Sequence, residues 1–350
     1  MKTLRKFGFI VALMLFATGA VFAQKQPNIP TVQETEQTAN ATDEQIVNIG
    51  SQDMAGNAGL TQEKRMLPNI HILATGGTIA GTGTGSSNTQ TNYKAGQVAI
   101  GTLISAVPEI EQIANVTGEQ IVNIGSQDMT DDVWLTLAKR INELLARDDI
   151  DGIVITHGTD TMEETAYFLN LTVKSDKPVV LVGAMRPSTA MSADGPLNLY
   201  NAVVVAAAKE SVGKGVMIAM NGIIVGAHSA LKTNTVSVET FQAPTDGALG
   251  YIYNGKAFYT HESLKKHTTR SVFDVTNVTK LPKVGIVYSY SNMEGDVVKM
   301  MVEKGYKGII HAGLGNGNIH KNVFPELINA REKGVLVVRS SRVPTGPTTL

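Results

Sequence analysis

Two threonine-bearing turns contain the residue types best suited to chemistry in this sequence. Residues 74–81 (ATGGTIAG) follow the apolar run 70–73, and residues 156–164 (THGTDTMEE) follow the apolar run 153–155. Short β-branched or aliphatic runs of this kind are typical of buried parallel strands. Ligands of open α/β sheets bind at the carboxyl ends of such strands. Two hydroxyls delivered there, one beside an aspartate, favour a nucleophile and its helper, and therefore an enzyme.

Length and composition restrict the other possibilities. The chain has 350 residues, of which 43% are hydrophobic and 34 are glycine, so it is long enough for two domains with separate cores. It carries 30 basic and 31 acidic residues, for a formal net charge of -1. That balance argues against nucleic acid as a partner. Cysteine is absent, which excludes a disulfide framework, a thiolate nucleophile and a zinc-thiolate site.

The first 23 residues have the pattern of a signal peptide. Basic residues precede the apolar run 7–16, and residues 21–23 (VFA) fit the spacing that a signal peptidase recognises. An amino-terminal membrane anchor is the alternative, but the run is short for a bilayer that needs about 20 residues. No later segment is long and apolar enough to span a membrane. We therefore expect cleavage after Ala23, export to the periplasm and no membrane association afterwards.

A polar segment without periodicity follows, and residues 24–66 are predicted to be a flexible linker. Within it, residues 44–54 (EQIVNIGSQDM) are repeated letter for letter at 119–129. Only the second copy precedes a helix signal, in which Thr130 caps a helix with one apolar face; that face comprises Trp134, Leu137, Ile141 and Leu144. The first copy is expected to be non-functional. Competition between the copies for one strand position is the alternative.

Beyond the linker, strand and helix signals alternate in the manner of βαβ units, which predicts an α/β fold with a parallel-type sheet flanked by helices. Strands are predicted at 70–73, 152–155, 178–182, 215–220, 284–288, 308–312 and 335–338. We predict a larger N-terminal domain over 67–255, an inter-domain linker over 256–281, and a smaller α/β C-terminal domain over 282–350.

Several segments in order resemble the bacterial type II (periplasmic) L-asparaginases of the asparaginase/glutaminase family. They are the two threonine turns, GSQDM at 125–129, VGAMRPST at 182–189, KTNT at 232–235 and VRSSRVPTG at 338–346, and the likeness covers about 67–350. The resemblance implies an L-asparaginase, an amidohydrolase that converts L-asparagine to L-aspartate and ammonia without metal or cofactor. It also implies glutamine as a possible lesser substrate, and a homotetramer.

Amide hydrolysis needs a nucleophile, a base and donors for the oxyanion. Thr78 follows two glycines that let the backbone approach a substrate closely, and the resemblance implies that it is the nucleophile. The resemblance also implies that Tyr93, beyond a Gly/Ser/Thr-rich loop, closes over the site like part of a lid. The alternatives are that Thr78 merely ends a tight turn and that Tyr93 is a surface residue.

The resemblance implies a second catalytic group made of Thr159, Asp160 and Lys232. A lysine shielded from water beside an aspartate can pass a proton to a hydroxyl more readily than a solvated lysine. The local pattern offers another interpretation, because Asp160 and Glu163 have the spacing of a capping box. Taken alone, Lys232 would more often be a solvated surface lysine.

Substrate binding completes the expected site. Ser126 and Gln127 offer hydrogen bonds to an α-carboxylate, Asp160 could pair with an α-ammonium, and Gly77 lies where the backbone approaches the substrate. The resemblance implies that Asn292 is contributed by a neighbouring subunit. Ser126 and Gln127 could instead belong to an ordinary polar loop.

Other functions have less support. The glycine runs lack the GxGxxG and GK[ST] patterns of nucleotide sites, and the seven histidines lack metal-ligand spacing. A periplasmic amino-acid binding protein would also be exported and α/β, but would not use a Thr-Lys-Asp relay. Family members continue past 343–346 with helices and an acidic residue, whereas this chain ends at Leu350. We therefore expect a truncated C-terminal domain and a poorly active, association-prone fragment; an inactive fragment is the alternative.

Overall fold

The computed structural model describes residues 67–83, 93–94, 96 and 100–349. The expected signal peptide, the linker and the first copy of the repeat lie outside these described residues. Within the part of the chain that is described, no helix is both long and apolar enough to cross a membrane.

An eight-stranded sheet is the largest element of the fold, with the strand order β12-β11-β8-β7-β6-β5-β1-β4. The strands from β4 to β7 along this order are parallel, whereas β8, β11 and β12 join by antiparallel pairing. Their bounds are β1 Asn69–Gly76, β4 Asn115–Ile124, β5 Gly152–Thr156, β6 Val179–Val182, β7 Val216–Met220, β8 Ile223–Gly226, β11 Gly250–Tyr253 and β12 Lys256–Tyr259. The predicted α/β fold with a parallel-type sheet is confirmed.

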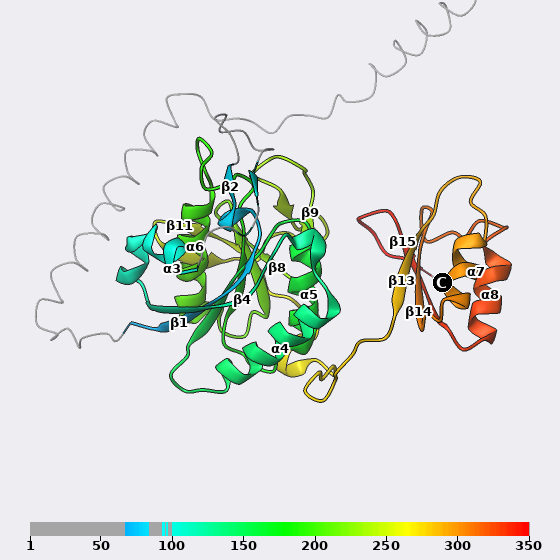
Figure 1. The fold of residues 1–350 in the computed structure, drawn as a ribbon, viewed down its shortest axis with the longest axis horizontal. Helices are drawn as coiled ribbons and strands as arrows, with labels where there is room; N and C mark the ends of the chain where they lie inside the picture. The colour runs from blue at the N-terminus through cyan, green and yellow to red at the C-terminus, as the bar shows by residue number, and fades with distance from the viewer. Residues whose placement is uncertain (1–66, 84–92, 95, 97–99, 350) are drawn as a thin grey trace, which may run out of the picture. The chain divides into compact units, whose positions relative to one another are not determined.

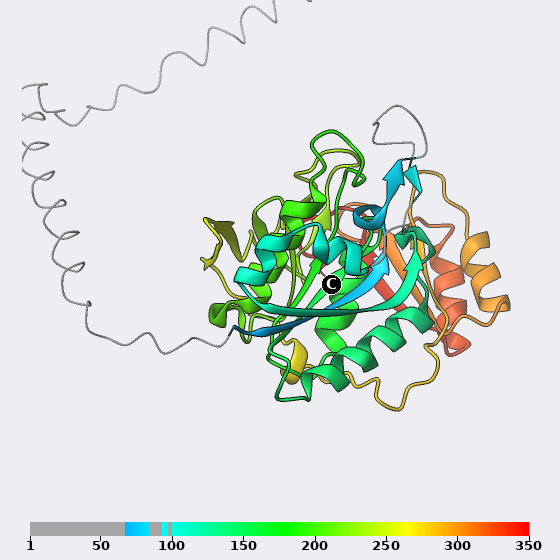
Figure 2. The same cartoon turned by 60° about the vertical axis from the view of Figure 1, so that its left-hand side comes forward.

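Helices cover both faces of this sheet (Figure 1, Figure 2). One face packs against α4 (Asp131–Leu145) and α5 (Met162–Thr172), and the other against α3 (Ile100–Ser105) and α6 (Gly195–Ala207). Ile153 and Ile155 of β5 point into the first core, and Val154 points into the second. Because both faces are buried, the central strands are continuously apolar, and this made them recognisable in the sequence.

Strand β4 was not predicted, although it contains much of the second copy of the repeat. It lies at the edge of the sheet and pairs only with β1 among the described strands. Most of its side chains are exposed or half-buried, so its sequence is too polar for an apolar-run criterion. The helix after it is confirmed: Thr130 is the N-cap of α4, and its hydroxyl accepts a hydrogen bond from Val133 N at 3.4 Å.

A separate three-stranded parallel sheet is formed by β13 (Val284–Tyr288), β14 (Gly308–Gly313) and β15 (Leu336–Ser341), in that order. These strands confirm the three predicted runs. Helices α7 (Asp296–Glu303) and α8 (Phe324–Glu332) pack on one face. The opposite face exposes apolar side chains, namely Val284, Ile286, Tyr288, Leu336 and Val338.

The segment expected to be an inter-domain linker, 256–281, begins differently from the prediction. Its first four residues form β12, the edge strand of the larger sheet, which pairs with β11. The rest contains a short 3-10 turn, Thr268–Arg270, and Val275 lies in the first core, with α4 and α5. Strand β12 is only four residues long, begins with Lys256 and alternates between exposed and half-buried side chains, so it was not found in a search for apolar runs. The other domain boundaries stay a prediction.

Two short antiparallel ribbons complete the fold and matter for the site. In the first, β2 (Thr82–Gly83) pairs with β3 (Tyr93–Lys94). In the second, β9 (Leu231–Lys232) pairs with β10 (Phe241–Gln242).

Candidate active site

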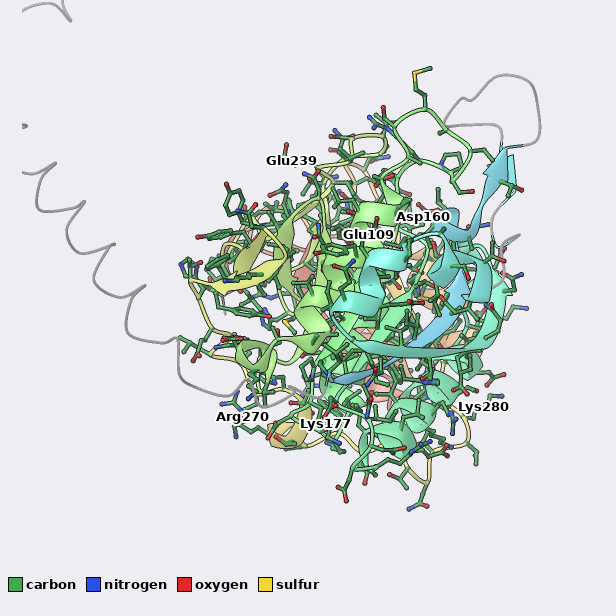
Figure 3. The ribbon with its side chains drawn as sticks, turned by 90° about the vertical axis from the view of Figure 1, so that its left-hand side faces the viewer. Glu109, Asp160, Lys177, Glu239, Arg270 and Lys280 are labelled. Carbon is green, nitrogen blue, oxygen red and sulfur yellow. The ribbon has the colours of Figure 1, made fainter. Side chains whose placement is uncertain are left out.

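The topology brings the carboxyl ends of three neighbouring strands, β5, β1 and β4, together at one edge of the larger sheet. Strands β1 and β5 are neighbours, but the chain proceeds from β1 to β4 on one side and from β5 to β6 on the other. Loops that diverge in this way leave a crevice at the carboxyl ends of the strands. Figure 3 shows Asp160 near the end of the sheet that bears the β2–β3 hairpin, and Lys177 toward the opposite end.

Glycines allow the loops after β1, β4 and β5 to touch. Gly77 has φ 81°, and a Cβ on it would overlap the backbone of Gly158. A Cβ on Gly158 would lie only 2.5 Å from Ser126 Oγ and 3.2 Å from Gly77 Cα. Larger residues at these glycines would separate the loops. Thr78 and Thr159 each follow one of these glycines, and both are buried, so the structure brings the two predicted threonine turns together.

The predicted group of Thr159, Asp160 and Lys232 is assembled in the structure. Lys232 Nζ donates to Thr159 Oγ1 at 2.9 Å and to Asp160 Oδ1 at 2.6 Å. The Lys232 side chain is 18% exposed, whereas the Asp160 side chain is 57% exposed. The lysine is therefore largely shielded from water while the carboxylate stays open to a ligand. This geometry fits a proton relay that ends at the Thr159 hydroxyl.

The capping-box interpretation of Asp160 and Glu163 is wrong. Helix α5 begins at Met162 with Thr161 as its N-cap, and no side chain makes a capping hydrogen bond there. Asp160 instead binds the Lys232 amine, and the Glu163 carboxylate accepts a hydrogen bond from Lys232 N. Charge-assisted bonds to a residue brought in from β9 replace the local pattern.

Ser126 and Gln127 lie in the 3-10 turn Ser126–Asp128 that follows β4. Ser126 is buried; its Oγ accepts from Asp160 N at 3.1 Å, and its carbonyl accepts from Thr161 Oγ1 at 2.8 Å. Ser126 therefore supports the turn that carries Asp160, and its own hydroxyl proton could still be donated to a ligand. Gln127 is exposed, and its Nε2 donates to Asp128 Oδ2 at 3.2 Å.

Two predicted site residues are not placed in this group. Tyr93 lies in β3, where its backbone is opposite Gly83, and its side chain is outside the described part of the structure, as are residues 84–92 of the predicted lid. The chain after the ribbon returns toward the turn of Thr78, since Gly96 N donates to Gly77 O at 3.1 Å. Asn292 follows β13 in the three-stranded sheet, with φ 59°. Among the described hydrogen bonds, none joins Asn292 to Thr159, Asp160 or Lys232.

A buried hydrogen-bond chain that sequence reasoning missed lies beneath the second threonine turn. His157 Nδ1 is 2.6 Å from Gly158 O, and its Nε2 is 2.9 Å from Thr165 Oγ1. A carbonyl only accepts, so Nδ1 carries the proton and Nε2 accepts from the Thr165 hydroxyl. Thr165 in turn accepts from Trp134 Nε1 at 2.8 Å. The chain ties α4 and α5 to the carbonyl that precedes Thr159. The only sequence signal was a histidine directly after a buried strand.

Burial gives His157 a testable effect on stability. Burial lowers the pKa of His157 from 6.5 to about 4. Between pH 4 and pH 6.5 the unfolded chain binds a proton at His157 that the folded chain does not. The free energy of unfolding is therefore unaffected by this group above pH 6.5 and decreases as the pH falls toward 4. One pKa unit corresponds to about 1.4 kcal/mol, so the loss would be about 3 kcal/mol.

We expect this loss in urea unfolding of the parental chain between pH 7.5 and pH 4, and a smaller one in His157→Gln, whose side chain does not titrate. Comparison with the variant is needed because burial also lowers the pKa of other histidines, namely His71, His267 and His311. The same pH dependence in both chains would show that His157 is not the buried neutral group described here.

Comparison with known families gives matches over most of the chain. Residues 69–265 match the family model "Asparaginase, N-terminal". Residues 283–350 match the model "Glutaminase/Asparaginase C-terminal domain". The chain is 60% identical to "L-asparaginase 2" of Escherichia coli over 283 residues, which is 81% of this chain and 80% of that one. It is 59% identical to "Probable L-asparaginase periplasmic" of Haemophilus influenzae, over 81% of this chain and 80% of that one.

Other similar proteins have names that include a second substrate or a different cellular location. A protein named "Glutaminase-asparaginase" from Pseudomonas fluorescens is 48% identical, over 84% of this chain and 80% of that one. A solved structure, titled as a probable cytoplasmic L-asparaginase from Campylobacter jejuni, aligns with a TM-score of 0.79 and 54% identity. The alignment covers 81% of this chain and 86% of that structure.

Proposed function

The chain belongs to the asparaginase family, and from that premise we propose that it hydrolyses L-asparagine to L-aspartate and ammonia through a threonine nucleophile. The observation that carries the mechanism is Lys232 Nζ, which bridges Thr159 Oγ1 and Asp160 Oδ1. Thr159 and Asp160 lie on the loop that packs against the turn of Thr78.

In the proposed first step, Thr78 Oγ attacks the side-chain carboxamide carbon of asparagine. The hydroxyl proton leaves as the C–O bond forms, and the Thr159 hydroxyl on the adjoining loop, together with the Lys232 amine bound to it, receives or returns protons. Collapse of the tetrahedral intermediate breaks the C–N bond, and the nitrogen takes up a proton and leaves as ammonia.

The second step consumes one water molecule. Water attacks the acyl carbon of the Thr78 ester, gives one proton back to Thr78 Oγ1 and leaves its oxygen in the new carboxylate of aspartate. Its second proton is released and taken up by ammonia to give ammonium, so atoms and charge balance over the cycle without another co-reactant. The same two threonines therefore serve both halves of the reaction.

The free amino-acid head is proposed to bind at the open side of the cluster. Asp160 is well placed to pair with an α-ammonium because more than half of its side chain is exposed. Ser126 and Gln127 would hold the α-carboxylate through hydrogen bonds. Tyr93 would close over the substrate, and Asn292 would act from a neighbouring subunit. These last two roles rest on the family resemblance alone.

Steady-state ammonia release from L-asparagine tests the proposal directly. We expect many turnovers per chain, and slower release from L-glutamine in a parallel assay. One methylene between the two substrates is discriminated by only about 1 to 3 kcal/mol, so the ratio must be measured. An amino-acid binding protein would bind asparagine without releasing ammonia, and that result would reject the enzyme.

Replacing Asp160 by alanine is expected to weaken aspartate binding by at least about tenfold, because a partner of the α-ammonium is lost. Isothermal titration with aspartate measures this. Glu164→Ala, which removes an exposed carboxylate of α5, should leave the affinity unchanged. Equal affinity in Asp160→Ala and the parental chain would mean that Asp160 does not hold the substrate head.

Location and assembly are part of the proposal. The basic and apolar pattern of residues 1–23 supports export to the periplasm, as does the name of the Haemophilus influenzae relative, which calls that protein periplasmic. Cell fractionation would decide between this and the cytoplasmic location in the name of the Campylobacter jejuni structure. A homotetramer is proposed from the family resemblance, and sedimentation would measure it.

A further inference from the structure

The strand that carries Lys232 has little structure of its own. Strand β9 is only two residues long and, among the described strands, pairs only with β10, in a two-stranded ribbon outside both larger sheets. The next ribbon contact is Thr233 N to Thr240 O at 2.7 Å. An isolated two-stranded ribbon is marginally stable at best. This ribbon is anchored through β10, because Phe241, the residue opposite Lys232, is buried in the first core. The position of the Lys232 amine therefore depends on what further contacts hold β9 itself.

Glu163 provides such an attachment. Its Oε2 accepts a hydrogen bond from the backbone amide of Lys232. Glu163 lies in the first turn of α5, which is anchored in the core through Met162, Ala166 and Leu169. The residues that bind the Lys232 amine, Thr159 and Asp160, precede the same helix. One rigid segment thus holds Lys232 at both its amide and its amine.

The environment of Glu163 fits a positioning role. Burial raises the pKa of this carboxyl, while the hydrogen bond from Lys232 N opposes the rise. A half-buried carboxylate is costly unless it is hydrogen-bonded, so the bond to β9 compensates for its desolvation. The neighbouring Glu164 is exposed, and its side chain makes no hydrogen bond or ion pair among the described contacts. It offers a matched control in the same helical turn.

We propose that Glu163 is a positioning residue that fixes the register of β9 and so places Lys232 Nζ against Thr159 Oγ1. The inference rests on the proposed function, since Lys232 matters here only as part of the relay. It goes further, because it assigns a role to a side chain that touches neither the substrate nor the reacting atoms. Misplacement of a catalytic group by about 1 Å can reduce a rate by about a hundredfold.

The test compares Glu163→Ala, Glu163→Gln and Glu164→Ala in steady-state ammonia release. Glu163→Ala removes the acceptor, and we expect kcat to fall about 10-fold to 100-fold while KM changes less than about threefold. Glu163→Gln keeps an oxygen that can accept from the amide, so it should retain kcat within about threefold. Glu164→Ala should behave as the parental enzyme. Thermal melting and circular dichroism show whether each variant is folded.

If Glu163→Ala does not fold, Glu163→Asp takes its place, because it keeps the charge but shortens the side chain by one methylene. Its kcat should fall in the same way. Parental kcat in either shortened variant would overturn the inference, as would a Glu163→Gln enzyme as slow as Glu163→Ala, because charge would then matter instead of the acceptor. Lys232→Ala is measured alongside: full activity in that variant would reject the relay itself, whereas its loss with an active Glu163→Ala would reject only the role of Glu163.

Discussion

Replacing Thr78 by alanine is expected to lower kcat for asparagine at least about a hundredfold, the scale for losing a nucleophile or its equivalent. The side-chain hydroxyl is the attacking atom of the proposed first step, and alanine has none. The turn itself should persist, because its bond from Gly81 N to Thr78 O, 2.8 Å long, involves only backbone. Ammonia release under saturating asparagine measures the loss.

Thr78→Ser serves as the control, since it keeps a hydroxyl at the same position and should retain far more activity than Thr78→Ala. Thr78→Ala should also still bind aspartate and melt near the parental temperature, which separates lost chemistry from lost structure. Near-parental ammonia release from a folded Thr78→Ala would eliminate the acyl-enzyme at this residue and move the search for a nucleophile to Thr159.

Replacing Lys232 by alanine is expected to have an effect of similar size, at least about a hundredfold on kcat. The Lys232 amine joins the Thr159 hydroxyl to the Asp160 carboxylate. Its removal therefore interrupts the proposed proton path and removes a hydrogen-bond donor from both residues. General acid–base groups typically contribute about 10²-fold to 10⁴-fold. Initial rates of ammonia release, with thermal melting in parallel, measure this prediction.

Lys214→Ala is the matched control, because Lys214 forms an ion pair with Glu262 away from the threonine turns. It should leave kcat unchanged. Lys232→Arg tests the chemistry more finely: it keeps a positive charge, but a guanidinium does not release a proton at ordinary pH, so activity should stay low. A folded Lys232→Ala enzyme with parental kcat would contradict the relay, and Lys232 would then be a structural contact of Asp160.

The strands that surround the site could be predicted because their signals are local. Runs such as 152–155 and 178–182 are apolar throughout, as expected of strands covered on both faces, and they appear in the structure as β5 and β6. Edge strands were missed for the complementary reason. Strand β4 is half-exposed and β12 alternates between exposed and half-buried residues, so neither produces a continuous apolar run.

The sequence by itself determined which chemistry is possible. Without cysteine, side-chain hydroxyls are the natural candidates for the nucleophile. Two of them, Thr78 and Thr159, follow apolar runs and glycines, a pattern that predicts the end of a buried strand. These signals are local, because the hydrophobic pattern, the glycine positions and the residue types can each be recognised within a few consecutive residues. The resemblance to a family then connected these residues to Lys232, which no local pattern would have singled out.

Only the tertiary structure decided how the polar side chains are paired. Asp160 and Glu163 have the spacing of a helix cap, yet both are bound to Lys232, about 70 positions further along the chain. Ser126 supports Asp160 because the close approach of Gly158 leaves its hydroxyl against that turn. These pairings depend on where distant loops lie, and the packing of the whole sheet and its helices sets those positions. A local hydrogen bond and a long-range one contribute similar net free energies, so the local sequence does not decide which of the two forms.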